Sequence, residues 1–137
     1  MAAELDHHAA LVHVMVMTAA ADADMTDLEL RTIGDIVRHL PIFRDYDENR
    51  LSADASSCAE QLSDEDGLDI ALDRIAEALP AKLRETAYAL ACDIAAADGS
   101  VSQEESRLLE MMRHVLEVGR LPAAAIERGA RARHVVL

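Results

Sequence analysis

Two short acidic stretches carry oxygen-bearing side chains of the type and spacing that hard cations require. In the first stretch, Asp22 and Asp24 are separated by one residue, and Glu29 follows five positions later. The alternation places two carboxylates on the inside of one turn, and Glu29 can return to them from the first turn of a following helix. Because Ca²⁺ and Mg²⁺ are bound by carboxylate, carbonyl and water oxygens, this stretch is a candidate site for a divalent cation.

The second stretch repeats the first in altered form, with Asp98 lying 76 positions after Asp22. Three alanines before each aspartate coincide, as do a hydroxyl residue and a glutamate after it. Ser100 replaces the second aspartate, so we expect the second site to be the weaker one. The candidate metal ligands are therefore Asp22, Asp24, Glu29, Asp98, Ser100 and Glu105, with Asp93, one helical turn earlier, as a weaker addition.

Neither stretch is an EF-hand loop. That loop needs a bidentate glutamate at its twelfth position, and counting from Asp22 or Asp98 this position holds Ile33 or Leu109. A metal site in these stretches must therefore use another geometry, in which the two turns can also act jointly if the fold brings them onto one face.

The same residues also have a purely structural interpretation. Thr26 with Glu29, and Ser102 with Glu105, each match the capping box, in which the glutamate bonds back to the amide of the cap residue. Such caps are worth about 1 kcal/mol each, and the helix dipole favours acidic side chains at this end. The stretches are thus interpreted as helix caps, as a cation site or as a contact for another protein.

The remaining reactive residue types form no pattern typical of catalysis. The six histidines contain no His-x-x-x-His pair, and His7 and His8 are expected to be exposed near the N-terminus. Cys58 and Cys92 lack Cys-x-x-Cys spacing and are expected to be core residues. Since the sequence also contains no glycine-rich phosphate loop and no nucleophile motif, it predicts a protein that is not an enzyme.

The elements that position the acidic stretches are predicted to be helices. Apolar residues make up 51% of the 137-residue chain but aromatic residues only 2%, a composition typical of packed helices. Apolar side chains recur at helical spacing in six segments, at about residues 4–20, 26–40, 47–62, 63–79, 80–97 and 102–118. A short helix over about residues 122–133 is the seventh.

Local signals place the ends of several of these helices. Ser63 with Asp66 predicts a cap for the fourth helix, and Pro80 suits the first turn of the fifth. Gly99 can adopt the left-handed conformation that ends the fifth helix, and Pro122 can open the seventh. We expect an all-α bundle of about seven helices, forming a single domain over residues 1–137, in which two hairpins around the acidic turns pack with approximate two-fold symmetry and the middle helices bridge them.

The charge of the chain indicates the kinds of partner that it can bind. The formal net charge is -13, which disfavours nucleic acids and anionic lipid surfaces as partners. Cations and basic protein surfaces are favoured instead, although an acidic surface also simply promotes solubility. The N-terminal apolar run is interrupted by His13 and Asp22 and has no basic region before it, which argues against a signal peptide or membrane span. A cytoplasmic location is expected.

The two acidic stretches resemble the tellurite-resistance TerB family. The resemblance rests on Ala20-Ala21-Asp22-x-x-Met25-Thr26-x-x-Glu29 and on Ala96-Ala97-Asp98-Gly99-x-Val101-Ser102-x-x-Glu105, and it covers roughly residues 5 to 120. Two departures distinguish the copies, because Ala23 stands where the second copy has Gly99 and Ser100 replaces Asp24. Neither copy therefore has both the glycine and the paired aspartates.

The resemblance implies properties that the residues alone do not establish. Members of this family are expected to be helical, cytoplasmic bacterial domains whose acidic face binds divalent cations such as calcium. The resemblance also implies association with tellurite resistance or other stress responses, through complexes with partner proteins near the membrane. Similar domains occur fused to J-domain co-chaperones of the DjlA type, so the fold is not tied to one role.

Overall fold

The computed structural model describes residues 5–21, 26–97 and 99–137, and within these ranges all regular secondary structure is helical. This confirms the predicted all-α class. The described chain contains seven α-helices: α1 (His7–Ala20), α2 (Asp27–His39), α3 (Leu51–Leu62), α4 (Gly67–Ala78), α5 (Arg84–Ala96), α6 (Gln103–Val115) and α7 (Arg120–Arg133). Short 3₁₀ turns lie at Pro41–Phe43, Glu48–Arg50 and Ala81–Leu83. None of these helices combines the length and the hydropathy that crossing a membrane requires.

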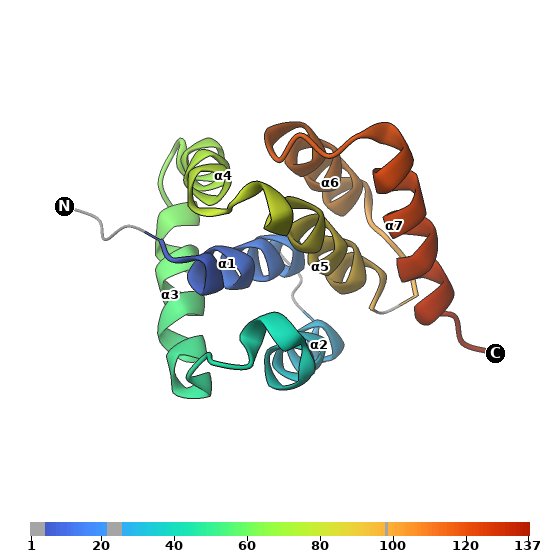
Figure 1. Cartoon of the computed structure of the whole chain (residues 1–137), viewed down its shortest axis with the longest axis horizontal. Coiled ribbons are helices and arrows are strands. Elements are labelled where there is room, and N and C mark those ends of the chain that lie inside the picture. Colours follow the sequence, from blue (N-terminus) through green and yellow to red (C-terminus); the bar gives the residue numbers. More distant parts are fainter. Residues whose placement is uncertain (1–4, 22–25, 98) are drawn as a thin grey trace.

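Helix α1 lies at the centre of the molecule (Figure 1). Every residue from His8 to Ala19 is buried. The sequence predicted one apolar face for this helix, but α1 is instead covered on all sides, mainly by α3, α4 and α5. A helix that is apolar around its whole circumference can be accommodated only in such an interior position.

Helix α5 lies beside α1 as a second central helix, with α6 and α7 next to it (Figure 1). Helices α1 and α5 pack on each other; α1 also packs on α3, and α5 also packs on α7. The second helix of each hairpin also reaches the first helix of the other, since α2 contacts α5 and α6 contacts α1. Helix α4 contacts α1, α3 and α6 and so bridges the two halves. These contacts match the predicted pair of related hairpins.

The helix boundaries show the internal repeat directly. Helices α1 and α5 end at Ala20 and Ala96, and α2 and α6 each contain 13 residues, beginning at Asp27 and Gln103. All these boundaries are displaced by the same 76 positions as the two acidic stretches. The repeat recognised in the sequence is therefore a repeat of helix–turn–helix units.

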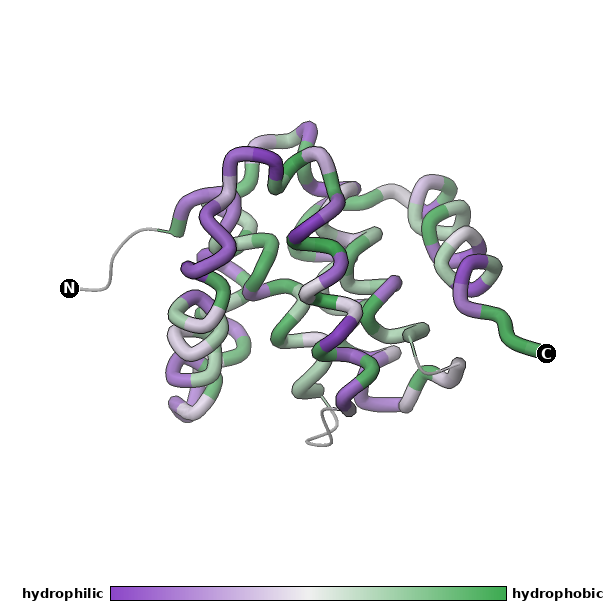
Figure 2. The backbone as a smooth tube through the Cα atoms, turned by 90° about the horizontal axis from the view of Figure 1, so that it is seen from below, coloured by the Kyte–Doolittle hydropathy of each residue, from purple (hydrophilic) through white to green (hydrophobic). Residues whose placement is uncertain are grey.

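The core is built from aliphatic side chains, with hydrophilic residues along the outer helices (Figure 2). Cys58 and Cys92 are buried free thiols, which confirms their expected place in the core. Burial raises the pKa of both thiols to about 12. Neither cysteine is therefore a reactive thiolate near neutral pH.

The connector after α2 closes over the N-terminal end of α1, and this makes the predicted exposure of His8 wrong. His8 is only 6% exposed, and its Nε2 lies 2.8 Å from the carbonyl oxygen of Ile42. Phe43 and Tyr46, both buried, pack with ring centroids 5.6 and 5.1 Å from that of His8. The aromatic residues thus plug this end of the bundle.

The capping signal formed by Ser63 and Asp66 predicted a wrong helix start. Ser63 does not cap α4: it follows the last residue of α3, and its hydroxyl donates to the carbonyl oxygen of Glu60 at 2.7 Å. Asp66, expected inside the first turn, is instead the residue before α4. The connection between α3 and α4 is short, so Ser63 is still engaged with the end of α3.

The two prolines also lie elsewhere than predicted. Pro80 precedes a 3₁₀ turn that leads into α5, instead of lying in the first turn of that helix. Helix α7 begins at Arg120, two residues before Pro122, and its 14 residues make it as long as α1. A proline is tolerated in the first helical turn because its missing N–H has no partner there.

We predict that Gly67→Ala destabilises the fold. A Cβ added at Gly67 would overlap the carbonyl oxygen of Gln61, a backbone atom that can move only if the connection between α3 and α4 shifts. Overpacking of this kind typically costs about 1–3 kcal/mol, and urea denaturation measures the loss.

The matched control is Gly34→Ala on the surface of α2, where the nearest atoms belong to the flexible Arg38 side chain. Replacing a helical glycine with alanine there should stabilise by about 0.5–1 kcal/mol. Equal stability of Gly67→Ala and the native protein would contradict the proposed close approach.

Candidate functional site

The first acidic turn leads into α2 through a complete capping box. The Glu29 Oε1 atom accepts hydrogen bonds from the Thr26 amide at 2.9 Å and from the Thr26 hydroxyl at 3.0 Å. In return, the Glu29 amide donates to Thr26 Oγ1 at 3.1 Å. Glu29 is only 3% exposed. Its carboxylate is therefore part of the helix start, as the capping interpretation predicts.

The second turn leads into α6 in the same way. The Ser102 amide donates to Glu105 Oε1 at 3.0 Å, and the Glu105 amide donates to Ser102 Oγ at 3.0 Å. Glu105 is also 3% exposed. The two predicted capping boxes are thus confirmed, and each uses one carboxylate oxygen of a residue that was also a candidate metal ligand.

Gly99, in the second acidic turn, has the predicted left-handed backbone conformation, with φ of 88°. Its amide donates to the carbonyl oxygen of Ala96 at 3.0 Å. The next residue, Ser100, is exposed. Only a residue without a Cβ adopts this backbone conformation without strain, which accounts for glycine at this position.

The structure places three of the six predicted ligands. Glu29 and Glu105 occupy equivalent buried positions at two helix starts, while Ser100 lies on the surface. Asp22, Asp24 and Asp98 lie outside the described residues. Among the residues that are described, no three His, Cys, Asp or Glu side chains lie close enough together to hold a metal ion.

Cavities border both acidic turns. A cavity of about 340 Å³ is lined by Ala20 and Ala21 at the end of α1 and by Glu104 and Arg107 near the start of α6. The end of the first helix of one hairpin thus lies beside the start of the second helix of the other. A cavity of about 510 Å³ borders Gly99 and the next two residues, with the C-terminal end of α7 on its other side.

Asp93, the weaker candidate, has another partner. Its Oδ1 atom lies 2.6 Å from the Arg133 guanidinium and 3.4 Å from His134 Nε2. The carboxylate therefore ties the last turn of α5 to the end of α7.

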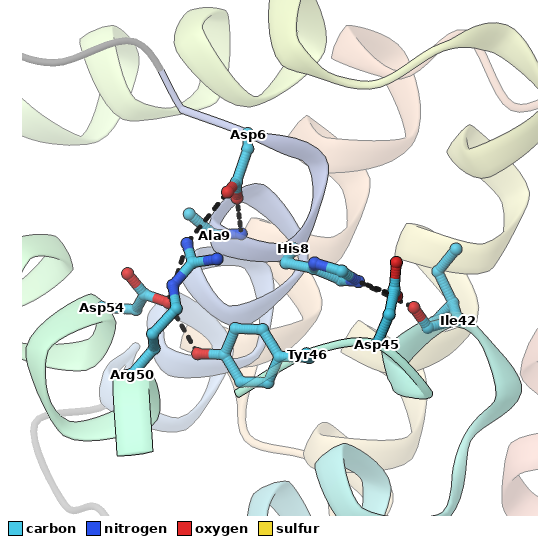
Figure 3. Close-up of polar contacts among 8 residues, drawn as sticks. All are labelled: Asp6, His8, Ala9, Ile42, Asp45, Tyr46, Arg50 and Asp54. Atoms are coloured by element: carbon cyan, nitrogen blue, oxygen red, sulfur yellow. Dashed lines mark hydrogen bonds and ion pairs between the residues drawn. The ribbon is translucent and has the colours of Figure 1, made fainter. Parts of the chain in front are cut away.

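A polar cleft of about 690 Å³, which no sequence pattern indicated, lies between the N-terminal half of α1, helix α3 with the turn after it, and Arg74 of α4. Part of its lining is the network in Figure 3. Asp6 caps α1 by accepting from the Ala9 amide at 2.7 Å, and its other oxygen accepts from Arg50 at 3.0 Å. Burial raises the pKa of Asp6, but these bonds and the charge of Arg50 outweigh it, so the pKa lies below the ordinary value.

Arg50 connects this cap to α3. Its guanidinium lies 3.6 Å from Asp54 Oδ2 and stacks over the Tyr46 ring, with Cζ 5.1 Å from the ring centroid (Figure 3). Asp54 Oδ2 also accepts a hydrogen bond of 2.6 Å from the Tyr46 hydroxyl. Burial together with the Asp54 bond raises the pKa of Tyr46. The network fixes the connector, α1 and α3 relative to one another.

His13 is a buried polar residue in the cleft lining. Its side chain is 2% exposed, and its Nε2 atom has no hydrogen-bond partner among the described residues. Burial lowers the pKa of His13, while the carboxylate and backbone of Asp54 act in the opposite direction. A histidine within the apolar run from Ala9 to Met17 is the signal from which the sequence could have indicated a polar group here.

The chain contains two helix–turn–helix units, each of which begins with a central helix and has a capped second helix. These units define the class of protein, which is an all-helical domain with an internal repeat. A comparison with protein-family models matches residues 8–128 to the tellurite resistance protein TerB family. The match covers most of the chain, and the protein therefore belongs to this family. Comparisons with curated proteins and with solved structures gave no significant match.

We predict that removing either cap weakens the fold by a similar amount. Thr26→Ala and Ser102→Ala each delete a hydroxyl that accepts a hydrogen bond from a helix amide. Each loss should lower the free energy of unfolding by about 0.5–2 kcal/mol. Thermal or urea unfolding measures the change. The control is Thr32→Ala on the exposed face of α2, where the hydroxyl only donates back to the Leu28 carbonyl and its loss should be near neutral. Cap variants no less stable than this control would contradict the capping assignment.

Proposed function

We propose that this TerB-family protein is a non-enzymatic, cytoplasmic stress-response protein that binds a divalent cation such as Ca²⁺ through its two acidic turns. The observation that carries the proposal is the repetition itself. Both turns follow a buried helix, both end in the same capping box, and each capping box is preceded in the sequence by Ala-Ala-Asp. A capping box alone does not require the aspartates that precede the two cap residues, Asp22 and Asp98.

The caps narrow the choice of ligands. Glu29 and Glu105 each give one oxygen to a backbone amide, so the cation is assigned chiefly to Asp22, Asp24 and Asp98. Ser100 lies on the surface beside Asp98 in the sequence and can add a hydroxyl oxygen. Since the first turn has two aspartates and the second has one, we expect the first turn to bind more tightly.

Calorimetric titration with Ca²⁺, Mg²⁺ and Mn²⁺ tests this assignment. The native protein should show saturable binding, and an Asp22→Asn, Asp98→Asn double variant should bind at least about tenfold more weakly, because each substitution removes a ligand charge. A double variant with Asp69→Asn and Asp73→Asn on the exposed surface of α4 changes the net charge equally and should bind like the native protein. The absence of saturable binding at millimolar metal, or equal losses in both variants, would overturn the cation proposal.

The second candidate function is an interaction module whose acidic face binds a basic partner, with the turns serving only as caps. The capping geometry favours it, because both glutamates are buried and bonded to cap amides. In addition, a helix N-terminus carries partial positive charge, which opposes a bound cation. The net charge of -13 supplies the attraction for a basic surface.

This second candidate predicts a different response to salt and chelator. Capture of a basic protein by the immobilised chain should decline as NaCl is raised from about 0.05 to 0.5 M, because exposed charges are then screened. Capture should also be unaffected by EDTA. A complex that persists at high salt but dissociates when EDTA is added would support the cation proposal instead.

A further inference from the structure

An apolar groove lies where α6 meets the first half of the molecule. It is the cavity of about 340 Å³ beside the ends of α1 and α3 and the starts of α4 and α6. Apart from Glu104 and Arg107, every lining residue is apolar. Met17 and Leu108 are buried and form the floor, whereas Leu68 is 38% exposed. A concave apolar surface that stays open to water favours contact with apolar side chains of another molecule.

The internal repeat does not require this apolar lining. Counted back by 76 positions, Leu108 and Met111 of α6 correspond to Thr32 and Asp35 of α2. The two helices therefore begin with the same capping box but differ in polarity at these places. Burial in the core accounts for Leu108, whereas Met111 is only partly buried. Methionine is a residue that adapts to apolar partners of different shape.

Carboxylates form the margin of this groove. Glu104 is in the lining, where Arg107 is the basic side chain. The turn between α3 and α4 is flanked by two lining residues, Leu62 and Leu68, and carries three more carboxylates. All four are exposed and make no ion pair within the described residues. This acidic margin consists of Glu104, Asp64, Glu65 and Asp66.

The combination of an apolar groove and an acidic margin selects among partners. A fatty acid or an anionic lipid would bring negative charge next to the carboxylates, which disfavours both. A second copy of this chain carries the same net charge of -13 and is disfavoured for the same reason. An amphipathic helix presents its apolar side chains on one face, and lysine or arginine residues on its flanks would lie beside the acidic margin.

We propose that the groove binds the apolar face of a basic amphipathic helix from another protein. A large apolar side chain of that helix packs against Met17 and Leu108, and its basic side chains lie beside the acidic margin. This contact rests on the second candidate function, the interaction module, and specifies the surface and the class of partner. Divalent cations take no part in it.

A synthetic peptide of about 18 residues, long enough to form a helix, is the probe for this contact. It carries leucines on one helical face and lysines elsewhere. Calorimetry should show saturable binding that weakens as NaCl is raised and persists in EDTA. Two control peptides should not bind: one with the same residues reordered so that the leucines share no face, and one with glutamate in place of lysine. No binding of the first peptide, or equal binding of a control, would overturn the proposal.

Two variants of α4 test the position of the contact. Leu68→Ser removes the exposed leucine of the groove and should weaken peptide binding about tenfold or more, because a large apolar side chain is lost from the contact. Ile70→Ser removes a similarly exposed side chain that does not line the groove, and it should bind like the native protein. Equal losses in both variants would contradict the proposal. Self-association of the native protein that Leu68→Ser abolishes would assign the groove to a second copy instead.

A matched pair of double variants tests the acidic margin. Glu65→Gln with Glu104→Gln should weaken peptide binding about threefold or more and reduce its dependence on salt. The control is Glu77→Gln with Glu85→Gln, which removes two exposed carboxylates outside the groove lining. Glu85, like Glu104, lies in the first turn of its helix, so both variants lose the same dipole interaction. Equal weakening in both double variants would overturn the assigned margin.

Methionine methyl resonances locate the bound peptide. Met111 lines the groove, whereas Met15 is fully buried and does not line it. The peptide should shift the Met111 methyl resonance and leave that of Met15 unchanged. An unchanged Met111 resonance at saturating peptide would overturn the groove as the site. Salt-sensitive capture of basic proteins by the same sample would then leave the second candidate function standing without this groove.

Discussion

The arrangement of the helices depends on the burial of α1 around its whole circumference. A helix with Leu11, Met15 and ten neighbouring residues all buried has no face that can meet water, and each large apolar side chain gains about 1.5–3 kcal/mol on burial. Helices α3, α4 and α5 must therefore surround it at once. Helix α5 packs on both α1 and α7, so the second half of the chain is also built on one central helix.

Full burial of α1 places strict demands on its polar side chains. Thr18 satisfies its hydroxyl within the helix, by donating to the Val14 carbonyl oxygen at 2.8 Å. His8 reaches the connector, where Ile42 supplies a carbonyl oxygen. The His13 Nε2 atom is buried and has no hydrogen-bond partner among the described residues. An apolar residue at this position would avoid that cost.

Local chemistry made part of this structure predictable from the sequence. The capping boxes need only residues three positions apart, and the repeat supplied the same signal twice, so the starts of α2 and α6 followed directly. The Ser63 signal was equally local but wrong, because the short connection before Gly67 keeps Ser63 at the end of α3. The burial of His8 and the existence of the cleft depend on residues that are distant in the sequence and meet only after the helices pack. Helical spacing contains no information about such meetings.

The two copies of the acidic turn differ in a way that separates structure from binding. Their cap residues are chemically equivalent, Thr26 with Glu29 and Ser102 with Glu105, and both pairs make the same hydrogen bonds. The residues between the aspartate and the cap are not equivalent, because one copy has Ala23-Asp24 and the other Gly99-Ser100. A role in starting a helix requires only the cap pair, and both copies meet it equally. Cation binding depends on the number of carboxylates that remain, so the copies are equal as caps, and in the proposed function they are unequal as ligands because the first turn keeps two aspartates and the second keeps one.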